Sequence, residues 1–275
     1  QGYIEAKKKI FSNPPVGQRK PIAVVCIDTE DCFDIAEELE DDDVWTVIPV
    51  STCKRLDKGV FVEDGQLFEV REGDPVAIAD LHSMTHLKGQ HNHENIACAY
   101  AVIRHVYGEE PEKIITAMRS FGGLPHRQFL VRTIHDVAYV NDSKATNADA
   151  TARALAVFRR IYWIIGGQPK EGGLNGLDPY MDRITHAYLI GEAAPQFAAW
   201  LAERNVAFTQ CGTLDVAVAA AHKDAQAGNA TPHLEGAGVV LLSPACASWD
   251  QFQSFEHRGD VFADLVNNLD KDNSI

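Results

Sequence analysis

The sequence lacks the features that mark several specialised classes of protein. Its six cysteines form no Cys-x-x-Cys pair, so the spacing predicts neither a zinc site nor a disulfide framework, and scattered thiols are typical of a reducing cytosol. No apolar run reaches the ~20 residues that a membrane span needs, and no charged-then-apolar signal segment opens the chain. We therefore expect a cytoplasmic protein with no membrane partner.

Basic residues are also in short supply. The chain of 275 residues has 25 Lys and Arg against 39 Asp and Glu, which gives a formal net charge of −14. A nucleic-acid partner is therefore not expected, because phosphate neutralisation needs a basic surface. The charge does not exclude a nucleotide, which needs only a local positive pocket. The length predicts one large domain or two ordinary ones.

The first part of the chain shows helix and strand patterns that end at Phe121-Gly122-Gly123, which resembles a hinge. The alternating run Gly59–Val70 with Asp64-Gly65 at its centre predicts a hairpin, and the apolar spacing of Asn95–Val106 predicts a helix. The other elements expected here are helices at 4–11, 31–40 and 111–119 and strands at 22–27, 44–50 and 76–81. We predict a first domain of residues 1–123.

Residues 124–275, the second predicted domain, alternate regularly between apolar strands and helices. The strands are expected at 137–140, 160–165, 187–190 and 238–242, and the helices at 148–158, 195–204, 214–225 and 251–269. Strands separated by helices of this length imply right-handed crossovers and a doubly wound, mainly parallel, Rossmann-like sheet. Ligands of such sheets bind beyond the carboxyl ends of the strands.

The predicted strand ends are polar and carry two lysines. The first strand leads into the turn Asn141–Asn147, the second into the loop Gly166–Gly173, the third into Gly191-Glu192 and the fourth into Ser243–Ser248. Taken alone, the Asn141–Asn147 turn could be an ordinary helix cap, for which Thr and Asn are common residues. A helix N-terminus also presents free N–H groups and a positive dipole end. Together, these ends indicate a pocket for an anionic small molecule.

Several segments, in order, resemble those of the Mur ligase family. They are Gly89-Gln-His-Asn-His-Glu-Asn95, Gly123-Leu-Pro-His-Arg127, Asn141-Asp-Ser-Lys-Ala-Thr-Asn147, Gly166-Gly-Gln-Pro-Lys170, Leu242-Ser-Pro-Ala-Cys-Ala-Ser248, Asp250-Gln-Phe252 and Phe255-Glu-His-Arg-Gly259. The resemblance is specific because the matches keep the family order over most of the chain.

The resemblance implies a three-domain ligase of peptidoglycan precursor synthesis, and hence of cell-wall growth and cell division. Such an enzyme uses ATP and Mg²⁺ to activate a carboxylate as an acyl phosphate, which an amine then attacks. The branch most similar to this sequence joins D-glutamate to UDP-N-acetylmuramoyl-L-alanine. We expect a partial central ATP-binding domain followed by the C-terminal amino-acid-binding domain, and a monomer.

Carried over residue by residue, the resemblance assigns nucleotide contacts to Asn95, Arg127, Asp142 and Lys144. His91 and Asn92 belong to the first motif without an assigned role. Arg127 would reach a nucleotide phosphate and stabilise developing charge, and Lys144 would contact a phosphate or the substrate; both count as catalytic. Asn95 could also be a helix N-cap, with or without the nucleotide contact, and Arg127 could be a plain surface arginine.

The same comparison assigns the D-glutamate pocket to residues at the strand ends. Thr146 and Lys170 would bind the side-chain carboxylate, with Ser248 and Phe255 completing the pocket. A carboxylate needs such donors: a hydroxyl, an ammonium and a helix N-terminus. Trp249 is a further candidate, although an aromatic residue beside Ser248 could simply pack in the core.

Lys7 resembles the family's carbamylated lysine, whose new carboxylate helps to hold Mg²⁺. The alternative is that Lys7 is a solvated charge like Lys8 and Lys9. The chain departs from the family pattern in having no Gly-x-x-x-x-Gly-Lys-Ser/Thr loop to hold ATP phosphates, and it has no initiator Met. We therefore expect a C-terminal piece of a ligase that is inactive alone.

Two other functions remain open. An Asp after an apolar strand, Asp28, is typical of certain phosphohydrolases, but the second Asp of that pattern is replaced by Glu30. The second half could also bind an amino acid or nucleotide without chemistry.

Overall fold

The computed structural model describes residues 2–14, 20–84, 87, 89–229 and 238–269. The chain divides into two compact units, Gln1–Gly122 and Gly123–Ile275. Within the described ranges no helix is long and apolar enough to cross a membrane, and all six cysteines are free thiols.

Unit 1 contains a five-stranded sheet in the order β1-β2-β3-β4-β5. Its strands are β1 (Ile22–Cys26), β2 (Thr46–Ser51), β3 (Gly59–Glu63), β4 (Gln66–Val70) and β5 (Val76–Asp80). The first three are parallel, and β4 and β5 add antiparallel pairs. The predicted hairpin is confirmed: Asp64 and Gly65, both with positive φ, join β3 to β4.

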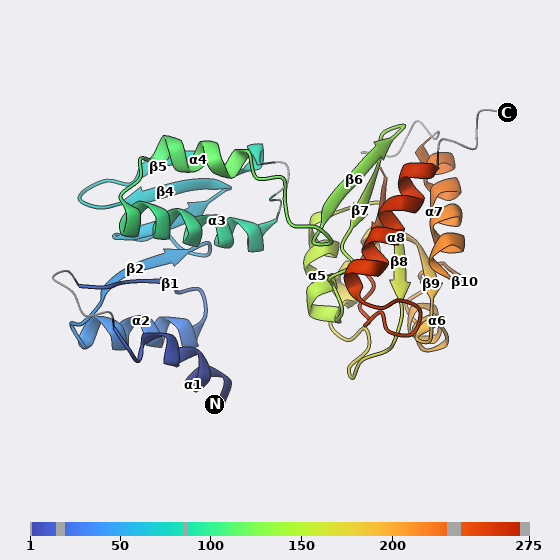
Figure 1. The fold of residues 1–275 in the computed structure, drawn as a ribbon, viewed down its shortest axis with the longest axis horizontal. Helices are drawn as coiled ribbons and strands as arrows, with labels where there is room; N and C mark the ends of the chain where they lie inside the picture. Colours follow the sequence, from blue (N-terminus) through green and yellow to red (C-terminus); the bar gives the residue numbers. More distant parts are fainter. Residues whose placement is uncertain (1, 15–19, 85–86, 88, 230–237, 270–275) are drawn as a thin grey trace. The chain divides into compact units, whose positions relative to one another are not determined.

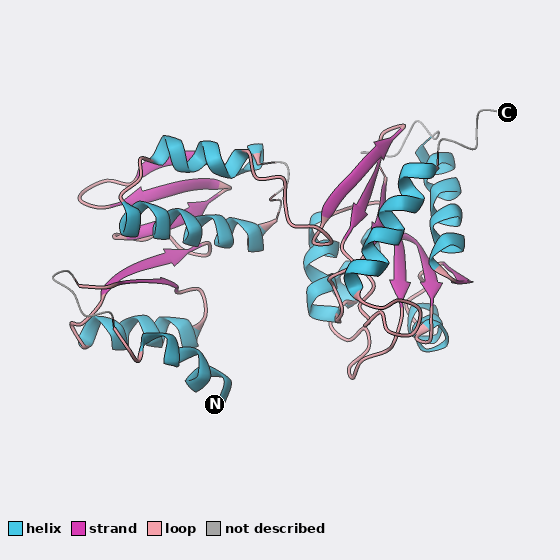
Figure 2. Ribbon diagram, viewed as in Figure 1, coloured by secondary structure: helices cyan, strands magenta, loops and turns pink. Residues whose placement is uncertain are grey.

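Helices cover both faces of this sheet (Figure 2). The helices are α1 (Gly2–Lys8), α2 (Glu30–Asp41), α3 (Gln90–Val102) and α4 (Pro111–Arg119), with short turns η1 (Lys9–Phe11), η2 (Leu81–Ser83) and η3 (Ile103–Tyr107). Apolar side chains of α2 pack on one face, where Ile35 and Leu39 are buried, and those of α3 and α4 pack on the other. Apolar side chains recur about every 3.6 residues in the helices and every second residue in the strands, so each element presents one apolar face to these layers.

Helix α3 differs from its prediction at both ends. It begins at Gln90, after Gly89, and continues into η3, which is a π-helical turn. The prediction that the helix starts at Asn95, and the alternative that Asn95 is its N-cap, are wrong. The residues before Asn95 are mostly polar, so they carry no apolar period, and the φ of 93° at Gly89 is what starts the helix there.

Unit 2 contains a six-stranded sheet in the order β10-β9-β8-β11-β7-β6. Its strands are β6 (Phe129–Ile134), β7 (Val137–Asn141), β8 (Ile161–Gly166), β9 (Ile184–Ile190), β10 (Phe208–Gly212) and β11 (Val239–Leu242). All pairs are parallel except β6 with β7. The predicted α/β class and mainly parallel sheet are confirmed; the edge strands β6 and β10 were not predicted.

The helices of unit 2 also lie on two faces (Figure 1). They are α5 (Ala148–Val157), α6 (Ala194–Ala202), α7 (Leu214–Asn229) and α8 (Phe255–Asn268), with a 3-10 turn η4 (Asp178–Arg183). α5 and α6 pack on one face, and α7 and α8 on the other. Strand β8 is buried throughout, which explains its continuous apolar run.

Candidate functional site

The parallel strands of unit 2 bring their carboxyl-end loops together. The loop after β11 meets the turn after β7: the Ser243 hydroxyl donates to Asp142 Oδ2 at 2.8 Å, and the Ala245 N–H donates to the Ala145 carbonyl at 2.9 Å. The loop after β8 meets the same β11 loop, because Gln168 and Ala247 exchange backbone hydrogen bonds of 2.9 and 3.1 Å. Three segments distant in sequence therefore form one edge.

Arg258, on α8, links the turn after β7 to the loop after β11. Its side chain is fully buried. The guanidinium donates to the hydroxyl and the carbonyl of Ser143, at 2.9 and 2.8 Å, and to the carbonyls of Cys246 and Ala247, at 3.2 and 3.3 Å. Burial lowers the pKa of Arg258 to about 10, so the group stays charged at neutral pH. Arg258 was not among the predicted site residues, although it lies in the matched segment Phe255–Gly259.

The predicted carboxylate binders lie side by side. Lys170 Nζ, an exposed ammonium on the β8 loop, is 3.3 Å from the Thr146 hydroxyl. The side chain of Asn147 caps α5 by accepting from the Ala150 N–H at 2.8 Å, so the predicted helix cap is confirmed. The ammonium, the hydroxyl and the start of α5 could together hold a carboxylate.

A shallow cavity of about 330 Å³ opens beside this edge. Its lining includes Arg127, Lys144 and Phe255, with Leu124, Pro125, His126 and Glu256. Lys144 Nζ lies 4.2 Å from the centre of the Phe255 ring, a cation–π distance. The structure thus brings Arg127 and Lys144 into one cavity, where two cations can attract an anion.

The loop that carries Arg127 is held in an unusual backbone conformation. His126 and Gln128, on either side of Arg127, both have positive φ, which costs energy for residues other than glycine. The His126 ring, largely buried, lies 3.2 Å from Asn141 Nδ2, and the His126 carbonyl accepts from the Lys144 N–H at 3.0 Å. These bonds fix the loop against the β7 turn, and sequence analysis gave His126 no role.

Gly259 permits the close approach of His126 to α8. A Cβ at this position would lie 2.1 Å from the ring atom Nδ1. Alanine normally stabilises a helix interior relative to glycine, but here we expect Gly259→Ala to lower the free energy of unfolding by about 1–3 kcal/mol. Chemical denaturation measures the change. Gly122→Ala, where a Cβ has open space, is the control and should be nearly neutral; a stabilised Gly259→Ala would contradict the close contact.

Asp142 is buried among hydrogen-bond donors. It is 4% exposed and accepts from the Gln128 N–H at 3.1 Å as well as from Ser243. Burial raises the pKa of this carboxyl to about 7, against the lowering effect of the two donors and of Arg127. Asp142, which was predicted to contact the nucleotide, therefore lies buried beneath the carboxyl-end loops and holds them together through these hydrogen bonds.

The other two predicted pocket residues differ in exposure. Ser248 is buried, at 3% exposed, whereas Trp249 is 71% exposed. The alternative that Trp249 packs in the core is therefore wrong. An exposed indole on this edge is available to a ligand, although the structure gives Trp249 no aromatic contact in the described ranges.

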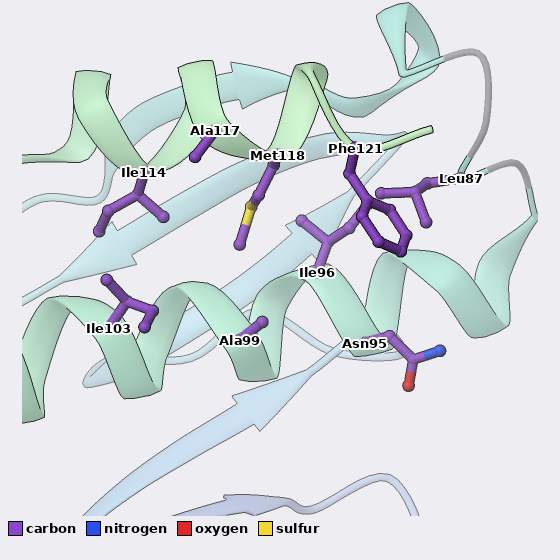
Figure 3. Close-up of a pocket in the computed structure, with 9 residues that line it drawn as sticks. All are labelled: Leu87, Asn95, Ile96, Ala99, Ile103, Ile114, Ala117, Met118 and Phe121. Atoms are coloured by element: carbon purple, nitrogen blue, oxygen red, sulfur yellow. The ribbon is translucent and has the colours of Figure 1, made fainter. Parts of the chain in front are cut away.

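In unit 1, Asn95 lies at the end of an apolar groove between α3 and α4 (Figure 3). The groove has a volume of about 430 Å³ and is lined by Leu87, Asn95, Ile96, Ala99, Ile103, Ile114, Ala117, Met118 and Phe121. Asn95 Nδ2 donates weakly to Asn92 Oδ1 at 3.5 Å. Its amide is exposed and is therefore accessible to a ligand that enters the groove.

Lys7 lies exposed on α1. Within the described ranges no group of three or more His, Cys, Asp and Glu side chains could hold a metal ion. Asp28, the candidate phosphohydrolase residue, is held by the Thr52 N–H at 2.7 Å, the Thr52 hydroxyl at 2.9 Å and the Ser51 hydroxyl. That environment keeps the pKa of Asp28 low, because these bonds outweigh the raising effect of burial.

Comparison with characterised sequences finds extensive similarity to one kind of enzyme. The chain is 50% identical over 268 residues to the UDP-N-acetylmuramoylalanine–D-glutamate ligase of Rhodospirillum rubrum, covering 98% of this chain and 54% of that protein. It is 45% identical over 270 residues to the corresponding ligase of Paramagnetospirillum magneticum, covering 98% and 56%. The chain thus spans about half the length of these relatives. No family model matches it.

Solved structures share the fold at low sequence identity. UDP-N-acetylmuramate–alanine ligase from Thermotoga maritima superposes with a TM-score of 0.57 at 11% identity, covering 90% of this chain and 52% of that one. The MurF ligase of the same organism, solved in complex with ADP, gives 0.54 at 18% identity, covering 97% and 58%. At such identities the likeness concerns the fold alone.

Proposed function

The chain is a Mur ligase homologue that spans about half of such an enzyme, and we propose that it supplies the amino-acid-binding part, and some of the nucleotide-binding part, of a D-glutamate-adding ligase. In the whole enzyme, ATP transfers its γ-phosphoryl group to the carboxylate of UDP-N-acetylmuramoyl-L-alanine, with release of ADP. The amine of D-glutamate then attacks the acyl phosphate, phosphate leaves, and an amide bond forms.

The observation that carries this proposal is the pairing of Lys170 with Thr146 at the carboxyl edge, 3.3 Å apart. A dicarboxylic amino acid needs such donors for the carboxylate that does not react. Arg127 and Lys144, which share the neighbouring cavity, would stabilise charge on the transferring phosphoryl group and on the acyl phosphate. Asn95 would contact the adenine, and Ser248, Trp249 and Phe255 would complete the amino-acid pocket.

The described residues include no group of three or more His, Cys, Asp and Glu side chains that could hold a Mg²⁺ ion by themselves. A carbamylated Lys7 would supply one oxygen ligand. We propose that the other ligands of Mg²⁺, like the groups that hold the ATP phosphates, belong to parts of the enzyme beyond this chain.

We expect this chain, as a monomer, to bind D-glutamate in preference to L-glutamate. Replacing Lys170 by Ala should weaken D-glutamate binding about 10- to 100-fold, because a charge-assisted hydrogen bond contributes about 1.5–3 kcal/mol. Titration calorimetry or ligand-detected NMR measures the affinity. Lys223→Ala, which removes an exposed lysine on α7, is the matched control and should bind normally.

The second candidate function, a binding module without chemistry, describes the chain by itself. We expect no ADP release when it is mixed with ATP and both substrates. ATP-dependent ADP release that requires both substrates would overturn this expectation. If the chain binds none of D-glutamate, L-glutamate and ADP, the result would count against a preformed pocket, and so against the proposed function.

A further inference from the structure

Unit 1 contains a second cavity, which is polar, and none of its lining residues lies in a segment that matches the family. It has a volume of about 540 Å³, in the usual range for small-molecule pockets. Its lining is formed by Ile48, Lys58, Gly59, Val70, Arg71, Arg104, His105 and Gly108. Among these described residues three are basic and none is acidic, in a chain with a formal net charge of −14.

This cavity lies at the edge of the sheet opposite to that expected for nucleotide binding. Strand β3 begins at Gly59 and runs parallel to β1 and β2, and β4 ends at Val70. The cavity is therefore at the amino ends of the parallel strands, whereas ligands of the fold bind at the carboxyl ends. Arg104 follows Asn95 by nine residues, which is roughly 14 Å along a helix. The two regions are distinct.

A buried carboxylate, Glu69, holds the basic side chains in place. It is 5% exposed and accepts hydrogen bonds from Arg71 Nε at 2.6 Å and from the Tyr100 hydroxyl at 2.8 Å. Arg104 Nε and His105 Nε2 lie 3.5 and 3.6 Å from its oxygens. Burial by itself raises the pKa of Glu69, but the hydrogen bonds and guanidinium charges outweigh it and leave the pKa below its usual value.

A π-helical turn places Arg104 and His105 next to the same carboxylate. Consecutive residues of a regular helix point in directions about 100° apart, and π-turns are costly features that occur frequently at functional sites. Arg104 Nε and His105 Nε2 are also buried without a hydrogen-bond partner among the described residues. Both atoms lie within ion-pair distance of Glu69, so the carboxylate rather than a ligand is their neighbour.

The charges at the mouth of the cavity are incompletely balanced. Arg71, half-exposed, uses only Nε towards Glu69 and has no other hydrogen bond to a described residue. Lys58 pairs with Glu40 at 2.8 Å and Arg104 approaches Glu110 at 3.9 Å, but both of these carboxylates are at least 49% exposed, so solvent weakens their effect. Two guanidinium groups thus face one buried carboxylate, and the Lys58 ammonium lines the same cavity.

We propose that this cavity binds a doubly charged tetrahedral oxyanion, either inorganic phosphate or the phosphate of a small phosphomonoester. Arg71 supplies a planar pair of donors from its free terminal nitrogens, which suits phosphate oxygens. Arg104 and Lys58 add charge, and Glu69 keeps the guanidinium groups fixed before the ligand arrives. The apolar side chains of Ile48 and Val70 leave room for the body of an ester.

Titration of the chain with inorganic phosphate, followed by calorimetry at constant ionic strength, tests the site. We expect phosphate binding that is weakened at least 10-fold in Arg71→Gln and by a smaller factor in Lys58→Gln, with Lys223→Gln as an unaffected charge control. Both altered side chains are at least half-exposed, so both variants should fold; circular dichroism checks this. Amide shifts in NMR spectra should map binding to Gly59 and Gly108.

Glycerol 2-phosphate distinguishes the two sources of the anion. Tighter binding of the ester than of phosphate assigns the cavity to a phosphomonoester, and equal binding assigns it to free phosphate. Three results would each overturn the proposal. The first is that no binding is detected at a phosphate concentration 10-fold above ~1 mM. The others are an affinity that is unchanged in Arg71→Gln and amide shifts that are confined to other regions.

Discussion

Replacing Arg258 by Met should destabilise unit 2 by about 3–5 kcal/mol, because each buried acceptor that is left unsatisfied costs about 1–3 kcal/mol. The guanidinium makes four hydrogen bonds, to Ser143, Cys246 and Ala247. Methionine fills much of the volume but leaves three carbonyls and one hydroxyl without this donor in a fully buried region. Because a domain is stable by only about 5–15 kcal/mol, the loss is a large fraction of the total.

Urea denaturation followed by circular dichroism and tryptophan fluorescence measures this loss. Arg153→Met is the control, because it changes an exposed arginine of α5 in the same unit and should shift stability by less than about 0.5 kcal/mol. Arg258→Lys should fall between the two, since an ammonium keeps the charge but not the fork of donors. If Arg258→Met unfolds within 1 kcal/mol of the unchanged chain, the two loops are held by other contacts.

The core of unit 2 was predictable because its strands and crossovers have strong local signals. The strand expected at 137–140 is β7, Val137–Asn141, and that at 160–165 is β8, Ile161–Gly166. Once the strands are parallel, their carboxyl ends must share an edge. The meeting of Lys170 with Thr146 therefore follows from topology rather than from any feature of either residue alone.

The edge strands had weaker signals. β10 is Phe208–Gly212, and its residues are half-buried or exposed, so it lacks the apolar run of a central strand. β6 is similar, with only Ile134 buried. Each of these edge strands pairs with a single neighbouring strand. A local sequence pattern does not show which strand that is when it lies far away in the chain.

Long-range polar networks were not predictable for the same reason. Arg258 bonds to Ser143, 115 positions earlier, and in sequence it resembles any charged residue of a surface helix. Glu69 accepts a hydrogen bond from Tyr100, 31 positions later. The alternation of β4 places Glu69 on the same face as the buried Leu67, but it does not identify the partner of the carboxylate. Only the fold shows that these charges have partners.

The free energy of unfolding should depend on pH through Asp142. Burial raises the pKa of this carboxyl from 3.8 to about 7, so the folded chain keeps a proton that the unfolded chain releases. The resulting stabilisation is complete below about pH 4 and is lost as the pH rises through 7. The expected slope is at most about 1.4 kcal/mol per pH unit, and stability should level off above pH 7.

Asp142→Asn isolates this effect, because an amide has nearly the same shape and does not titrate. Asn can accept from the Gln128 N–H and donate to Ser243, whose hydroxyl can turn to Thr151 Oγ1, 3.2 Å away. Urea denaturation of both proteins between about pH 4 and 8 should give a stability difference that changes by a few kcal/mol across this range. Parallel curves would show that Asp142 is already ionised in the folded chain at low pH, because its two donors and Arg127 would then outweigh burial.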